Sequence, residues 1–114
     1  MYAAATRIDF KVLIYRELDC DGDFVYVAQC LNYDLVTQGE SILAVLNSLE
    51  CIIKTQIKLS LEDGIEPFSD FEPAPRELWK KYEANASREK NAFSFSCDPA
   101  EKPLNAVAMM KLAA

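Results

Sequence analysis

The residues whose type and spacing could do chemistry are few, and the carboxylates come first. Asp19, Asp21 and Asp23 alternate around Gly22, an arrangement similar to the start of a calcium-binding loop. An EF-hand loop, however, needs glycine at its sixth position and glutamate at its twelfth. Counted from Asp19, glycine is fourth here and Cys30 is twelfth. The segment therefore predicts a solvated hairpin turn without a bound metal.

Asp9 and Asp34 form a second candidate pair, because two carboxylates can hold the divalent ion of a nuclease. Nothing in their spacing brings them together, and we interpret both as surface residues. The chain has no histidine, which removes the most common general base and metal ligand. We therefore expect no catalytic residue, no metal and no cofactor.

The four cysteines, Cys20, Cys30, Cys51 and Cys97, also lack the spacing of a metal site. No two of them form a C-x-x-C motif, and no histidine can complete a ligand set. We interpret them as free thiols. The tyrosines at 15, 26 and 33 could stack on nucleic-acid bases, but Arg16 is the single arginine among them and the local charge is negative, which favours sheet packing or a protein interface.

Composition and charge limit the classes of function that remain. The 114 residues, 51% of them hydrophobic, are enough for one domain with a packed core, residues 1–114. Apolar stretches are too short for a membrane span, and residues 1–7 do not resemble a secretory signal, so we expect a cytoplasmic protein. The net charge is −6. An acidic surface repels phosphate, so we expect no DNA binding and favour a basic protein partner.

Alternating apolar residues predict three strands in the first third of the chain. The first covers residues 8–15 and continues to residue 18, the second covers residues 24–29, and the third is short, residues 35–38. The Asp21–Gly22 pair between the first two strands favours a tight hairpin turn. Gly39 ends the third strand.

The apolar period then becomes helical, which predicts one long helix. Ser41 is a suitable N-cap, and Gly64 can take the left-handed conformation that ends the helix near Asp63. A broad apolar stripe on this helix predicts the face that packs on the sheet. The stripe consists of Ile42, Val45, Leu46, Leu49, Ile52, Ile53 and Ile57.

The remaining third is expected to extend this core. Residues 66–75 contain three prolines and predict an extended connector, with Phe68 and Phe71 docked on the core. Residues 76–84 predict a short second helix, and residues 92–97 and 104–112 a C-terminal β-hairpin. A terminal helix is the alternative for residues 104–112. The expected fold is α+β: a mainly antiparallel sheet of three to four strands in β-β-β-α order, one long helix on one face, a short second helix and the hairpin.

Residues 8–65 resemble the HicB-like antitoxin family. The resemblance lies in the strand Phe10-Lys11-Val12-Leu13-Ile14-Tyr15, the acidic glycine-containing turn and second strand from Asp21 to Leu31, and Val36-Thr37-Gln38-Gly39-Glu40-Ser41 before the helix. It implies a partial RNase-H-like fold. It also implies a non-enzymatic module that binds a small basic HicA-like ribonuclease toxin and covers its active site, or a solitary descendant of such an antitoxin. A small metal-dependent nuclease on the same scaffold is the alternative.

Two sets of contact residues complete the hypothesis. Asp21, Asp23, Asp34 and Glu40 are the candidate contacts of the acidic surface with a basic partner. The strands are apolar on both faces, and two candidates could cover the face that the long helix leaves bare: the chain's own tail, with Trp79, Tyr82, Phe93 and Phe95, or a second copy. We expect both together, and therefore a dimer or larger homo-oligomer. Its candidate interface residues are Leu13, Tyr15, Tyr26, Phe93 and Phe95.

Overall fold

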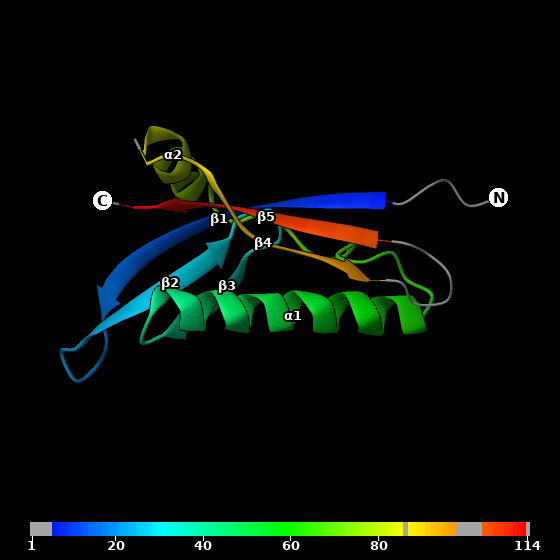
Figure 1. Cartoon of the computed structure of the whole chain (residues 1–114), viewed down its shortest axis with the longest axis horizontal. Helices are drawn as coiled ribbons and strands as arrows, with labels where there is room; N and C mark the ends of the chain where they lie inside the picture. Colours follow the sequence, from blue (N-terminus) through cyan, green and yellow to red (C-terminus); the bar gives the residue numbers. More distant parts are fainter. Residues whose placement is uncertain (1–5, 86, 98–103, 114) are drawn as a thin grey trace.

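The α+β class expected from the sequence is confirmed by a computed structural model, which describes residues 6–85, 87–97 and 104–113 (Figure 1). Five strands form one sheet in the order β3-β2-β1-β5-β4. The helix α1 lies along one face of this sheet, and α2 lies on the other side (Figure 1). The elements are β1 (Thr6–Leu18), β2 (Phe24–Cys30), β3 (Leu35–Gly39), α1 (Ile42–Glu62), α2 (Arg76–Ala84), β4 (Lys90–Cys97) and β5 (Leu104–Leu112).

The C-terminal hairpin joins the sheet, which corrects the expected strand count and pairing. β4 and β5 pair antiparallel, as the sequence predicts. β5 then lies parallel to β1, with Ile8 opposite Ala106 and Ile14 opposite Leu112. The sheet therefore has five strands, with three antiparallel pairings and one parallel pairing, where the sequence predicted three to four mainly antiparallel strands and a hairpin. Two parallel neighbouring strands need a long crossover connection, which here is the whole segment between β1 and β5. Local sequence patterns do not predict such a pairing.

The turn between β1 and β2 is built on a side chain. Asp19 Oδ1 accepts hydrogen bonds from the backbone N–H groups of Asp21 and Asp23, both at 2.9 Å. Gly22 has a φ of +85°, a left-handed conformation that costs glycine little. The expected hairpin turn is therefore present, and its geometry leaves the Asp21 and Asp23 side chains exposed at the tip.

The long helix begins and ends where capping residues predict. Ser41 Oγ accepts a hydrogen bond from the Ala44 N–H at 3.1 Å. At the other end, Gly64 has a φ of +71°, and the Ile65 N–H donates back to the Ser60 carbonyl at 2.8 Å. The buried residues of α1 all belong to the predicted stripe: Val45, Leu49, Ile53 and Ile57.

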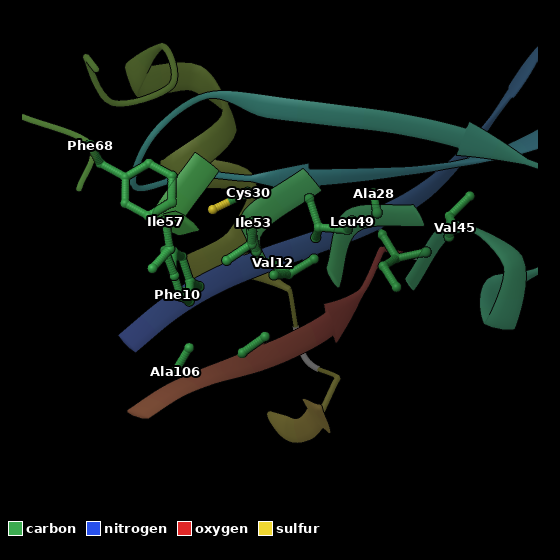
Figure 2. Packing of buried hydrophobic residues seen from close by; sticks show 12 residues of the cluster. Phe10, Val12, Ala28, Cys30, Val45, Leu49, Ile53, Ile57, Phe68 and Ala106 are labelled. Carbon is green, nitrogen blue, oxygen red and sulfur yellow. The ribbon is translucent and has the colours of Figure 1, made fainter. Parts of the chain in front are cut away.

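The main core lies between α1 and the sheet (Figure 2). Strand residues facing α1 in this core include Phe10, Val12, Ile14, Ala28, Cys30, Ala106 and Ala108. Gly39 lets the helix approach β3 closely, because a Cβ atom at that position would lie 3.0 Å from Val45 Cγ1. Thr37 Oγ1 also donates to the Val45 carbonyl at 3.0 Å, which ties the first turns of the helix to β3.

The proline-containing connector turns back on itself, which corrects the expectation of a continuous extended segment. Ser69 N–H donates to the Glu66 carbonyl, and Phe71 N–H donates to the Phe68 carbonyl. Phe68 has a φ of +64°, an uncommon conformation for a bulky residue. Its ring is buried in the main core and stacks on Tyr33 with 4.3 Å between ring centroids. Phe71 is 36% exposed and packs edge-on against Phe68, with 5.4 Å between ring centroids.

A second, smaller core forms where α2 covers the opposite face of the sheet. It contains Leu13, Leu31, Ala74 and Tyr82, with Tyr15, Leu78 and Trp79 packed around it. The Ala74 N–H donates to the Leu31 carbonyl at 2.8 Å, which joins the connector to the end of β2. Neither described helix is long and apolar enough to cross a bilayer.

Candidate partner-binding surface

Three of the four predicted acidic contacts lie at one end of the molecule. Asp21 and Asp23 occupy the tip between β1 and β2. Glu40 follows β3, whose last residue, Gly39, pairs with Tyr26 of β2. The β1–β2 turn and the start of α1 therefore lie at the same end of the sheet, as Figure 1 shows.

The most exposed large apolar side chains of the described residues lie at this same end. Leu18 and Phe24 are opposite each other where the hairpin begins to turn, and they are 61% and 63% exposed. Leu43, in the first turn of α1, is 68% exposed because it lies off the apolar stripe. The Arg16 guanidinium lies over the Phe24 ring, 4.9 Å from its centroid. We call this surface the hairpin end, defined by Leu18, Asp21, Asp23, Phe24, Glu40 and Leu43.

Charge is concentrated at the hairpin end. Residues 16–24 and Glu40 carry five carboxylates and one guanidinium, a net charge of −4 out of −6 for the whole chain. Apolar anchors surrounded by like charges are typical of a surface that binds an oppositely charged protein. The hairpin end can therefore attract a basic protein and then bury apolar area against it.

Asp34, the fourth predicted acidic contact, lies elsewhere. It is in the turn between β2 and β3, at the other end of β2 from Asp23. The seven residues of β2 span about 20 Å at the usual rise of a strand. Asp34 has a φ of +54° and accepts a hydrogen bond from the Gln29 side-chain amide. It therefore supports its own turn and does not extend the hairpin end.

The predicted oligomer residues fall on both faces of the sheet. Leu13 is fully buried beneath α2 within one chain, which leaves it no surface for a second copy. Tyr15 packs beside that second core, and its hydroxyl donates to Gln29 Oε1 at 3.3 Å. Tyr26 instead packs against the main core. For Phe93 and Phe95 the structure describes the backbone, which pairs them with Ala108 and Ala106.

The thiols and carboxylates that could form a reactive or metal site are dispersed. Cys20, Cys30 and Cys51 are free thiols, and burial raises the pKa of Cys30 to about 11. Cys97 lies outside the residues whose side chains the structure describes. Within the described part of the chain, no three residues with metal-binding side chains come together. Asp9 lies on β1 and Asp34 in the turn between β2 and β3.

A polar cluster that the sequence did not reveal joins α2 to the sheet. The Tyr82 hydroxyl donates to Glu89 Oε2 at 2.6 Å, and Lys11 Nζ lies 3.2 Å from the same oxygen. Lys111 Nζ lies 4.7 Å from the Tyr82 ring centroid. Burial, and then the Glu89 carboxylate, raise the pKa of Tyr82, whereas the hydrogen bond from Tyr82 and then that from Lys11 lower the pKa of Glu89. The cluster fixes α2 on the sheet and leaves its outer side exposed.

The outer side of α2 and the end of the connector form an open groove. Its apolar lining comes from Pro73, Ala74 and Trp79, and its charged lining from Arg76, Lys80 and Glu83. Trp79 is the only tryptophan of the chain.

Comparison with protein-family models, with curated proteins and with solved structures finds no match to this chain.

Proposed function

We propose that this protein is a non-enzymatic binding module of the HicB type, which covers a small basic ribonuclease. The observation that carries the proposal is the hairpin end, where exposed apolar side chains and a net charge of −4 coincide. The resemblance over residues 8–65 supplies the class of partner. The order of three antiparallel strands followed by one helix on one face agrees with the partial RNase-H-like fold that this resemblance implies.

The physical basis of inhibition in this proposal is competition with RNA. A ribonuclease that binds RNA needs a cationic surface to hold the phosphate backbone. The carboxylates of Asp21, Asp23 and Glu40 attract the same cations and speed association. Phe24 and Leu43 then bury apolar area against the partner, which slows dissociation. The basic surface, once covered, is closed to RNA.

The test uses the product of a small basic reading frame beside the gene or, if the gene has none, a purified HicA-type ribonuclease. Expected results are a complex of the two purified proteins and loss of RNA cleavage by the toxin as the present protein is added. The double variant Asp21→Lys/Asp23→Lys should weaken inhibition at least tenfold, a change of about 1.4 kcal/mol in binding. The matched control Glu62→Lys/Asp63→Lys reverses two exposed carboxylates at the far end of α1 and should inhibit like the wild type.

Two results would contradict the proposal. One is the absence of any small basic reading frame beside the gene, together with no effect on RNA cleavage by a purified HicA-type ribonuclease. The other is magnesium-dependent cleavage of RNA by the protein alone that Asp9→Asn or Asp34→Asn abolishes. That second result would favour the nuclease alternative.

A further inference from the structure

The outer groove of α2 has a charge opposite to that of the hairpin end. Residues 73–90 carry five basic and three acidic side chains, a net charge of +2. The groove lining itself carries Arg76, Lys80 and Glu83, a net charge of +1. The chain thus carries a net charge of +2 over residues 73–90 and of −4 at the hairpin end.

The two regions also complement each other in the kind of side chain they expose. The hairpin end projects beyond the N-terminus of α1, as Figure 1 shows, and presents Phe24 and Leu18. The groove offers Pro73, Ala74 and the half-buried Trp79 as an apolar floor. Arg76 and Lys80 line the same groove and are both exposed, so they can meet carboxylates.

We propose that the hairpin end of one copy of this protein docks in the α2 groove of a second copy. Phe24 lies against Trp79, and the carboxylates of Asp21 and Asp23 pair with Arg76 and Lys80. Two different patches meet, so the contact closes as a dimer only when both copies exchange hairpin ends and otherwise propagates as a chain.

This contact has a consequence for the partner surface, although it does not depend on the proposed function. A hairpin end seated in a groove is closed to any other protein. Self-association and partner binding therefore compete for Asp21, Asp23 and Phe24, and free monomer is the form that can bind a partner. Self-associated copies therefore cannot bind a partner until they dissociate.

The experiment uses the purified full-length protein alone, so its outcome is independent of any toxin. Variant A carries Asp21→Lys/Asp23→Lys, and variant B carries Arg76→Glu/Lys80→Glu. Mass is measured by light scattering and sedimentation up to about 1 mM, the upper limit for a weak specific contact. Far-UV circular dichroism verifies that each variant folds, and the control is Glu62→Lys/Asp63→Lys.

The expected result is association of the wild type and of the control, weakened by salt because exposed charges are screened. Variants A and B should each remain at 12.8 kDa, since like charges then face each other. Mixing A and B should restore association, because lysines at the A hairpin meet glutamates in the B groove, and the B hairpin meets the A groove. Association of the wild type should change the fluorescence of Trp79, because Phe24 of a second copy lies against it. Phe24→Ala should weaken association and abolish this change in fluorescence.

Three outcomes would overturn the proposal. The first is a wild type that stays at 12.8 kDa up to about 1 mM. The second is association that A and B retain at the strength of the wild type, which would assign the contact to another surface. The third is a mixture of A and B that stays monomeric although each folds.

Discussion

The strained backbone at Phe68 leads to a stability prediction that reverses a general rule. At most positions a protein with glycine is less stable than the same protein with alanine, by about 0.5–1 kcal/mol, because glycine loses more backbone entropy on folding. Phe68, however, has a φ of +64°, a left-handed conformation that costs a residue with a Cβ atom about 1–2 kcal/mol. Glycine pays no such cost. Phe68→Gly should therefore be more stable than Phe68→Ala by about 1 kcal/mol.

Both variants also lose the phenyl ring, and this loss determines how much less stable each variant is than the wild type. The ring contacts Tyr33 at 4.3 Å and Phe10 at 5.8 Å between centroids, and it is buried. Truncating a buried phenylalanine to alanine costs about 3–5 kcal/mol. A chain of 114 residues has a free energy of unfolding of about 6–17 kcal/mol. Both variants should therefore fold, with reduced stability.

The assay is urea unfolding followed by far-UV circular dichroism and by Trp79 fluorescence. The control pair is Phe71→Ala and Phe71→Gly, at a neighbouring exposed position without a positive φ, where alanine should be at least as stable as glycine. The reasoning would be refuted if Phe68→Ala were as stable as Phe68→Gly. A loss below about 1 kcal/mol for both would refute the assigned packing of the ring.

Three further predictions concern single groups. Tyr82→Phe removes a buried hydroxyl that donates to the Glu89 carboxylate and should cost about 1.5–3 kcal/mol in urea unfolding. Because the pKa of Tyr82 is raised in the folded state, this residue contributes fully to the free energy of unfolding below pH 10, and its contribution is lost as the pH rises above that value. The melting temperature of Tyr82→Phe should therefore depend less on pH above pH 10 than that of the wild type. In single-cysteine variants at pH 8, the exposed Cys20 thiol should react with a disulfide reagent at once, and the buried Cys30 thiol only when the protein opens. Equal reaction rates would contradict the burial of Cys30 in the core. Gly39→Ala should cost about 1–3 kcal/mol, because the added methyl meets a valine side chain at 3.0 Å, and a neutral effect would show that α1 can shift.

Local signals in the sequence were enough to predict the elements. The capping hydroxyl of Ser41, the left-handed Gly64 and the alternation in residues 24–29 depend on neighbours along the chain, and the structure confirms each element they predicted. Such features follow from backbone sterics and hydrogen bonding within a few residues. The boundaries of the second helix, residues 76–84, were predicted on the same basis.

Long-range features could not be predicted in this way. The parallel pairing of β1 with β5 depends on the whole tertiary arrangement, as does the burial of Leu13 beneath α2. The turn at Phe68 is similar, because only the packed ring compensates for its backbone strain. At the surface, the sequence identified Asp21 and Asp23 but not Phe24 as an exposed anchor, since an apolar residue in a strand is expected to be buried.

The position of β5 beside β1 has a consequence for synthesis of the chain on the ribosome. β1 is the middle strand of the sheet, yet its neighbour on one side is made last, with Ile8 paired to a residue 98 positions later, Ala106. Until that residue has emerged, β1 has an unpaired edge, and such edges recruit strands from other chains. The sheet therefore stays incomplete until β5 has left the ribosome. It passes through a stage in which chaperones, or another nascent copy, compete with β5 for the same backbone groups.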